Sequence, residues 1–230
     1  MLTIVRIHNE LLGTYGDRGN ADVLAFRAHL NGIAAEVVDI SYLEILPKSA
    51  DIYLMGGAED AAQALSLTAL EKGGALASAI SQGATLLAIC AGFQIVGESF
   101  TDGQGQEISG LGLLNVRTSP GEKRFVGDIK VKASFLDCEF TGFENHGGRT
   151  VLGEGVQPFG HVLVGHGNGA ESVDGAISGN VFGTYLHGPV LARNPEFADF
   201  LLAKTTGQST INYVDELAVE YAHWRRSVTK

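Results

Sequence analysis

The chain contains few of the residues that mark secreted, membrane-spanning or nucleic-acid-binding proteins. Two cysteines in 230 residues, Cys90 and Cys138, cannot build a disulfide framework and fit a reducing compartment. No run of 18 apolar residues is present, and Met1 leads directly into the strand-like LTIVRI, so we expect neither a membrane span nor a signal peptide. The formal charge is −10, and no basic stripe could neutralise phosphates. We therefore expect a soluble, cytoplasmic protein with no nucleic-acid partner.

What the chain does contain is typical of a globular α/β protein. Hydrophobic residues make up 45% of it and charged residues 18%, which is enough for a sizeable core. There are only five prolines, and no Pro- or Ser-rich linker divides the sequence. We find no internal repeat. The sequence therefore predicts one domain over residues 1–230.

Strand and helix patterns alternate in the first part of the chain. Short apolar runs of strand length are followed by helical patterns, and the expected strands are 2–7, 34–40, 52–55 and 85–89, with helices at 21–30 and 61–82, the latter interrupted at Gly73-Gly74. Such alternation predicts a mostly parallel sheet covered on both faces, in a flavodoxin-like three-layer arrangement. Ligands of these sheets bind outside the carboxyl ends of the strands.

The second part of the chain has a different pattern. Short strands split by glycine and polar turns are expected around Val116 and over 125–131 and 151–164, and we expect them to add antiparallel strands to the same domain. Residues 181–186 are expected to form a further strand, which ends at His187. Asn194-Pro195-Glu196 predicts a helix start with a side-chain cap and proline in the first turn. A last helix is expected from an apolar face, formed by Val214, Leu217, Ala218, Tyr221 and Ala222.

The stretch Thr85–Gly97, TLLAICAGFQIVG, carries the main chemical signal. Cys90 directly follows a buried strand, has small neighbours at Ala88 and Gly92, and precedes a helical pattern. This arrangement predicts a nucleophile elbow, in which helix N-terminal amides face the sulfur and favour the thiolate. The alternative is a buried structural cysteine, because free cysteine is among the most buried residue types.

His187 is the expected base for Cys90. It also follows an apolar strand, and parallel strands bring such ends to one edge of the sheet. A neutral imidazole is the usual group that activates a thiol near neutral pH. A solvated loop histidine is the alternative.

Backbone amides could bind the oxyanion that forms when Cys90 attacks a carbonyl. We assign this role to Gly57 and to Ala91, the residue after the nucleophile, and expect Gly56 to contact the substrate. A plain strand-to-helix turn would also need these glycines. No His, Cys or acidic residues stand at metal-ligand spacing, so we expect no metal and no other cofactor.

Five stretches together carry a family resemblance: TYGDRGN at 14–20, MGGAED at 55–60, ICAGFQ at 89–94, FENHGGRT at 143–150 and GTYLHGPVLARNP at 183–195. With these stretches the chain resembles class I glutamine amidotransferase domains of the cobyric-acid-synthase-like type. More narrowly, it resembles the glutaminase subunits of bacterial lipid II isoglutaminyl synthases. The resemblance spans nearly the whole chain in the family's order.

The resemblance implies a Cys-His glutaminase with a separate partner. Cys90 would attack the side-chain amide of L-glutamine, and His187 would transfer the protons. Ammonia would pass to a Mur-ligase-like, ATP-dependent synthetase subunit, which amidates D-glutamate of lipid II in cell-wall synthesis. The resemblance also places a substrate arginine at Arg124, where a guanidinium would pair with the α-carboxylate of glutamine. The alternative for Arg124 is a solvated surface charge.

One position departs from the wider family. Many relatives carry a glutamate two residues after the histidine, whereas Pro189 stands here. The resemblance implies that the partner subunit supplies this third catalytic carboxylate. Asp17 and Arg18 lie after the first strand, where we expect either a salt-bridged loop or a contact with the partner.

Three other functions remain open at this point. The chain could serve another amidation, such as a cobyric-acid-type synthase. It could be a stand-alone cysteine hydrolase on the same scaffold, although such an enzyme often has its histidine directly after the cysteine, where Ala91 stands. It could also be a regulatory binding subunit with vestigial Cys90 and His187.

Overall fold

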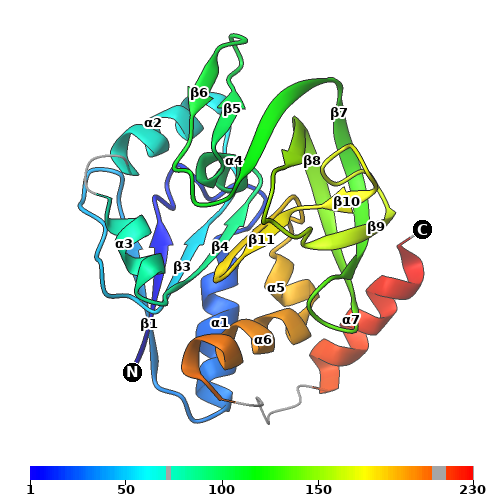
Figure 1. Cartoon of the computed structure of the whole chain (residues 1–230). Coiled ribbons are helices and arrows are strands. Elements are labelled where there is room, and N and C mark those ends of the chain that lie inside the picture. Colours follow the sequence, from blue (N-terminus) through cyan, green and yellow to red (C-terminus); the bar gives the residue numbers. More distant parts are fainter. Residues whose placement is uncertain (71–73, 209–215, 230) are drawn as a thin grey trace.

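The computed structural model describes residues 1–70, 74–208 and 216–229. Within these ranges the first of two sheets has six strands (Figure 1). In spatial order they are β11 (Ala176–Ser178), β12 (Val181–Thr184), β4 (Thr85–Ile89), β3 (Ile52–Met55), β1 (Leu2–Ile7) and β2 (Ala35–Ile40). Only β11 runs antiparallel to its neighbour among these described strands. The predicted, mostly parallel sheet is therefore present.

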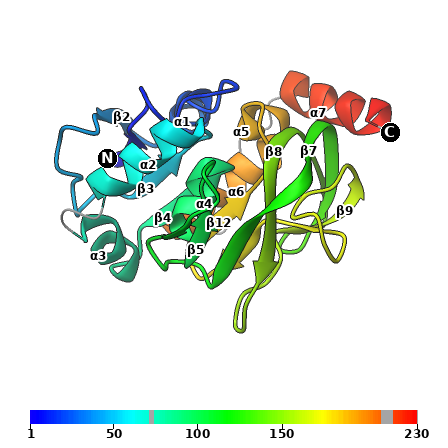
Figure 2. The same ribbon diagram turned by 90° about the horizontal axis from the view of Figure 1, so that it is seen from above.

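The strands predicted between Ser99 and Val164 form a second sheet beside the first (Figure 2), whereas the strand predicted at 181–186 joins the first sheet as β12. The strands of the second sheet are β10 (Val173–Asp174), β9 (Gly160–Val164), β7 (Val116–Ala133), β5 (Ser99–Thr101) and β6 (Glu107–Ser109), with β8 (Glu139–Leu152) paired to β7. Most of its pairings are antiparallel, and β5 with β7 is parallel. The added strands thus build a separate sheet, and the prediction of one domain over the whole chain stays a prediction.

Most of the helices cover the parallel sheet, whereas the last one packs against β8 of the second sheet and against neighbouring helices. The helices are α1 (Gly19–Leu30), α2 (Asp60–Leu70), α3 (Ala75–Ser81), α4 (Ala91–Val96), α5 (Val190–Arg193), α6 (Pro195–Thr206) and α7 (Glu216–Val228). Helix α1 packs against β1, β2 and α6, whereas α2 packs against α4, which follows β4. The predicted interruption at Gly73-Gly74 falls between α2 and α3, although Gly73 lies outside the described residues.

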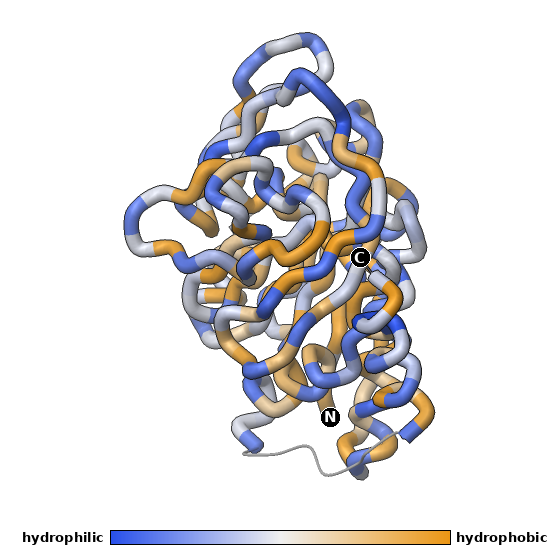
Figure 3. Tube along the Cα trace, turned by 90° about the vertical axis from the view of Figure 1, so that its right-hand side faces the viewer, coloured by the Kyte–Doolittle hydropathy of each residue, from blue (hydrophilic) through white to orange (hydrophobic). Residues whose placement is uncertain are grey.

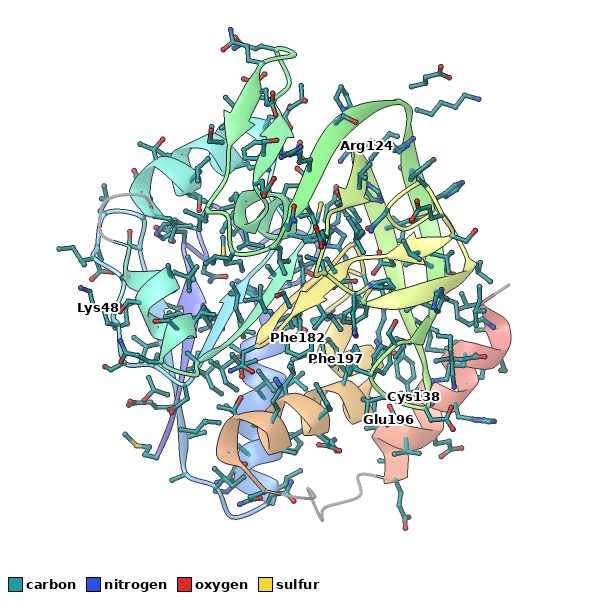
Figure 4. All side chains as sticks on the ribbon, in the orientation of Figure 1. Lys48, Arg124, Cys138, Phe182, Glu196 and Phe197 are labelled. Atoms are coloured by element: carbon teal, nitrogen blue, oxygen red, sulfur yellow. The ribbon has the colours of Figure 1, made fainter. Side chains whose placement is uncertain are left out.

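The central strands β3 and β4 are almost entirely apolar because they lie in the core of the parallel sheet. Every residue of β3 and β4 is buried, as expected for central strands with helices on both faces. Figure 3 shows hydrophobic stretches running through the interior and hydrophilic ones over the outer loops. Aromatic rings also tie the second sheet to the first sheet and to α6, because Phe135 contacts Phe182 and Phe140 stacks on Phe197. Phe182 and Phe197 lie close to each other in Figure 4. This packing sets the position of β7 and β8 relative to the ends of β4 and β12.

Two helix predictions need correction in detail. Helix α6 begins at Pro195 as predicted, but Asn194 makes no side-chain cap. Its side chain instead accepts a hydrogen bond from the Thr141 N–H and donates to the Thr141 and Val190 carbonyls. These bonds tie α5 and α6 to the second sheet.

Helix α7 is present, but its predicted apolar face is not buried. Leu217 is 78% exposed and Tyr221 47%, Ala222 is buried, and Val214 lies outside the described residues. Ion pairs from Arg225 to Asp128 and from Arg226 to Glu196 hold the helix in place. Across the described parts of the chain, no helix has the length and apolar character needed to cross a membrane.

Candidate active site

Four loops meet at one edge of the parallel sheet. β12 lies next to β4, β4 next to β3, and β3 next to β1, all running in the same direction. Their carboxyl ends therefore bring together His187, Cys90, the Gly56-Gly57 pair and the loop that follows β1. This is the edge where α/β sheets bind ligands.

Cys90 occupies the sharp turn between β4 and α4. Its backbone has φ 54° and ψ −107°, a combination that L-residues rarely adopt and that is found mainly at functional sites. The turn brings α4 against β3, since a Cβ on Gly92 would lie 2.8 Å from the Met55 Cβ. This close packing explains why the turn needs a small residue at position 92, as the sequence predicts. The Cys90 N–H is also fixed, donating to the Thr184 carbonyl at 2.9 Å.

His187 is fully buried beside this turn. Its backbone N–H and C=O both pair with Phe143 of β8, at 2.9 and 3.1 Å, which anchors the end of β12 to the second sheet. The ring of Tyr15 covers the imidazole, with 4.8 Å between ring centroids. Among the described residues, Nε2 has no hydrogen-bond partner of ordinary geometry, whereas Nδ1 has a carboxylate. The solvated-histidine alternative does not fit this environment.

The carboxylate belongs to Asp17, from the loop after β1. Its Oδ2 lies 2.8 Å from His187 Nδ1, and both side chains are about fully buried, at 1% and 0% exposure. Asp17 thus places a carboxylate of this chain on His187, and the expectation that a partner supplies a third catalytic carboxylate stays a prediction. Sequence reasoning missed the pair because it depends on the placement of β1 beside β3, which no local pattern encodes.

Asp17 also changes the expected oxyanion site. The Gly57 N–H donates to the same Oδ2 at 2.9 Å, so in this conformation it is not available to an oxyanion. The assignment of Gly57 needs this correction. The oxyanion role of Ala91 stays a prediction, and it is compatible with the position of Ala91 as the first residue of α4, where the N–H has no partner within the helix. Gly56 lies beneath the loop after β1, and its carbonyl accepts the Gly92 N–H at 3.2 Å.

The surroundings of His187 favour its protonated form. Burial lowers its pKa, but the sulfur of Cys90 and the carboxylate of Asp17 outweigh this effect and raise the pKa to about 10. An opposite charge within a few ångströms favours the charged state of a group in this way. At neutral pH the imidazole therefore holds a proton next to the Cys90 sulfur. A histidine in this state can protonate a leaving group.

Arg124 lies on β7 at a polar cleft of about 210 Å³. The cleft is lined by Gln63, Gln94, Thr118, Gly148 and Arg124, among other residues. Gln94 belongs to the helix that follows Cys90, and Gln63 donates to the Ala91 carbonyl at 3.4 Å, so the cleft adjoins the nucleophile turn.

The Arg124 guanidinium is held by a neighbouring strand. It donates from Nε to the Asn145 Oδ1 and from Nη2 to the Asn145 carbonyl, and Asn145 in turn donates to the Tyr15 hydroxyl at 2.6 Å. These hydrogen bonds connect the arginine to the ring that covers His187. Arg124 is exposed, but these hydrogen bonds fix the orientation of its guanidinium.

Cys138 takes no part in this arrangement. It lies near Glu196, well away from Arg124 (Figure 4). Burial first, and then the nearby Glu196 carboxylate, raise the pKa of its thiol to about 11, so the thiolate is scarce at neutral pH. We therefore do not expect Cys138 to act as a nucleophile.

A cysteine on a strained strand-to-helix turn, paired with a buried histidine on an adjacent parallel strand, defines a class of cysteine-dependent hydrolytic or amide-transferring sites. The chain belongs to the family described as the CobB/CobQ-like glutamine amidotransferase domain, whose sequence model matches residues 3–195. The family resemblance seen in the sequence is thereby confirmed.

The relatives are consistent with this membership. The chain is 37% identical over 201 residues to the glutamine-hydrolysing subunit GatD of lipid II isoglutaminyl synthase from Streptococcus pneumoniae, covering 86% of this chain and 77% of that protein. It is 38% identical over 215 residues to the same subunit from Staphylococcus aureus, covering 92% and 87%. A crystal structure of a glutamine amidotransferase superposes with a TM-score of 0.59 at 17% identity, over 90% of this chain and all of that one. The predicted fold class is thus confirmed.

Proposed function

We propose that this chain is the glutaminase subunit of a lipid II isoglutaminyl synthase. It hydrolyses L-glutamine to glutamate and ammonia and supplies the ammonia for amidation. The observation that carries the proposal is the strained turn at Cys90 beside the buried, proton-holding His187. The similarity to two GatD subunits supports the specific amidation over other members of the family.

The chemistry follows from the positions of the two side chains. The Cys90 sulfur attacks the side-chain carbonyl carbon of glutamine, and the carbonyl oxygen becomes an oxyanion near the Ala91 N–H. His187 gives its proton to the leaving nitrogen, the C–N bond breaks, and ammonia departs from a γ-glutamyl thioester. His187 then takes a proton from a water molecule that attacks the thioester, and glutamate is released as the sulfur regains its charge.

Arg124 is the proposed group that holds the α-carboxylate of glutamine. A planar guanidinium pairs with a carboxylate through two parallel hydrogen bonds, which fixes both position and orientation. The cleft supports this role, because Arg124 and Gln94 both line it and Gln94 belongs to α4, the helix that follows Cys90. A stand-alone cysteine hydrolase would not need such a clamp for a free amino acid.

The proposed partner is a Mur-ligase-like, ATP-dependent synthetase subunit that receives the ammonia and amidates D-glutamate of lipid II. The two GatD relatives are named as subunits of a synthase, which supports a heteromeric assembly. We propose that the complex works in the cytoplasm, where ATP and the lipid-linked precursor meet.

The decisive experiment measures ammonia release from L-glutamine by the purified chain, with and without the synthetase subunit. We expect hydrolysis that depends on Cys90, and amidation of lipid II only when both subunits and ATP are present. Hydrolysis coupled to another acceptor would favour a different synthase of the family. Absence of any glutamine turnover under both conditions would favour a regulatory subunit or a hydrolase with another substrate.

A further inference from the structure

The Arg124 guanidinium is oriented by a neutral partner. It donates from Nε to the Asn145 Oδ1 and from Nη2 to the Asn145 carbonyl, and within the described residues no carboxylate pairs with it. Acidic residues are not scarce, since the chain has 26 of them against 16 Lys and Arg residues, and Arg117 on the same strand pairs with Glu98. Arg124 therefore keeps an uncompensated positive charge at the edge of the polar cleft.

The Asn145 side chain is also held from its other side, by Tyr15. Its Nδ2 donates to the Tyr15 hydroxyl at 2.6 Å, and the Tyr15 ring lies over His187. Tyr15 has φ 55°, a conformation that a bulky residue rarely adopts and that persists only where the surroundings enforce it. An amide can accept from a guanidinium and donate to a hydroxyl at the same time, which a carboxylate cannot do.

The strand that carries Asn145 is anchored at the active edge. Phe143, two residues earlier in β8, exchanges two backbone hydrogen bonds with His187. Side chains alternate along a strand, so Phe143 and Asn145 lie on the same face of β8, and Tyr15 contacts both of them. The amide, and with it the Arg124 guanidinium, therefore has a fixed position relative to His187.

The hydrogen bonds to Asn145 leave one edge of the guanidinium open. They occupy the side that carries Nε, and Nη1 has no hydrogen-bond partner among the described residues. A carboxylate can bind the edge formed by Nη1 and Nη2 through two parallel hydrogen bonds. From this geometry we infer that Asn145 is the positioning residue that presents Arg124, with its charge unpaired, to the α-carboxylate of glutamine. This inference rests on the proposed function.

The Asn145→Ala variant tests the role of the amide. Without it the guanidinium can turn away from the substrate, so we expect KM for L-glutamine to rise about tenfold, while kcat stays within about threefold because the α-carboxylate does not react. Asn180→Ala is the matched control. Asn180 is also half-buried and donates a hydrogen bond to a distant segment, at the Gly83 carbonyl, but it precedes β12 and lies at the opposite edge of the sheet. Its kinetics should equal those of the wild type.

A substrate without the α-carboxylate separates positioning of Arg124 from a general structural role. With 4-aminobutanamide, which is glutamine lacking that group, kcat/KM should be the same for Asn145→Ala and the wild type, because Arg124 has nothing to bind. With L-glutamine the ratio should fall about tenfold. Equal losses on both substrates would overturn the inference, since they would mean that the substitution disturbs the site as a whole. Thermal melting checks that each variant folds.

The Asn145→Asp variant tests why the partner is neutral, and it conserves the shape of the side chain. A carboxylate here still accepts from Arg124, but it pairs with the charge that the substrate needs, so KM for L-glutamine should again rise about tenfold or more. An unchanged or lower KM would contradict the need for an unpaired charge.

A binding measurement does not depend on turnover. Calorimetric titration of L-glutamine into Cys90→Ser, with and without Asn145→Ala, should show affinity about tenfold weaker in the double variant. Equal affinities would overturn the inference. Weaker binding in the double variant, with no hydrolysis by the wild type, would support the role of Asn145 and overturn the proposed reaction. Absence of glutamine binding by Cys90→Ser itself would overturn both.

Discussion

The Asp17 carboxylate and the His187 imidazole are joined at 2.8 Å although 170 residues separate them in the chain. One follows the first strand of the sheet and the other the strand β12, so the contact forms only when the whole parallel sheet is assembled. The active histidine is therefore controlled by an early segment of the sequence. The following predictions test the residues around this pair.

Cys90→Ser should abolish glutamine hydrolysis and leave the fold intact. A serine hydroxyl has a far higher pKa than a thiol, so His187 cannot hold it in an ionised state. The glutaminase rate and the circular dichroism spectrum are measured on the same preparation. Activity within tenfold of the wild type would exclude Cys90 as the nucleophile.

An electrophilic glutamine analogue should label Cys90 and leave Cys138 unmodified. The two thiols differ because burial keeps Cys138 protonated, with its pKa raised to about 11. Peptide mass spectrometry identifies the modified residue, and excess L-glutamine should protect Cys90. Equal labelling of both cysteines would contradict a specific site.

Arg124→Ala should weaken the use of glutamine by about 1.5–3 kcal/mol, the range for a hydrogen bond to a charged group. The loss should appear mainly in KM, since the α-carboxylate does not change during the reaction. Arg117→Ala is the control, because Arg117 lies on the same strand, is 72% exposed and pairs only with Glu98 in the described structure. If both variants show the same steady-state kinetics, Arg124 is a surface charge and does not bind the α-carboxylate.

Gly57→Ala should inactivate the enzyme through the imidazole. A Cβ at this position would lie 2.6 Å from the His187 Cε1 and 2.8 Å from the Thr14 Oγ1, so the ring or the loop must move. A displacement of about 1 Å at a reacting group can lower the rate about 10²-fold. Glutaminase assays and thermal melting distinguish this local effect from unfolding. Full activity would show that the backbone at the end of β3 shifts to make room for the new methyl group, while the His187 ring keeps its position.

Asp174→Asn should stabilise the protein at alkaline pH. Burial raises the pKa of Asp174 to about 7, while Thr184 and the Tyr185 N–H donate to its carboxyl group. In the unfolded chain an aspartate ionises near pH 4, so between about pH 4 and 7 the folded state binds an extra proton and stability falls as pH rises. Above pH 7 the folded wild type carries the cost of a buried, ionised Asp174, whereas the variant, with its neutral amide side chain, does not.

The expected gain for Asp174→Asn is on the order of 2 kcal/mol at pH 8.5, and smaller at pH 5. Urea unfolding at the two pH values measures it. Asp137→Asn is the control, because Asp137 is exposed and pairs with Lys132 on the surface. A pH-independent difference between Asp174→Asn and the wild type would mean that Asp174 titrates normally.

The central strands could be predicted to the residue because they are buried on both faces. Residues 52–55 and 86–89 are wholly apolar, and residues 2–7 are apolar except for Thr3 and Arg6, and the structure has β1, β3 and β4 at the predicted bounds. The second sheet was harder to predict. Strand β7 continues through Pro120 and Gly121, where the sequence indicates a turn, because the pairing with β8 absorbs the irregularity as a shift in register before Phe125.

The same distinction applies to the site. Cys90 and His187 stand directly after apolar strands, so their positions follow from the direction of a parallel sheet. The partner of His187 has no such local signal, since Asp17 looks like any acidic loop residue until β1 is placed next to β3. Tyr15, which covers the imidazole, was missed for the same reason.

Pro189 packs closely against Gly16 and Gly19, and this packing limits which residues positions 16, 19 and 189 can hold. A longer side chain at position 189 would enter the space that the loop after β1 now fills, and a bulkier residue at position 19 would push into Pro189. The two segments can therefore change only together. A glutamate at position 189 would require a different path for residues 14–20, so the two loops behave as a single structural unit.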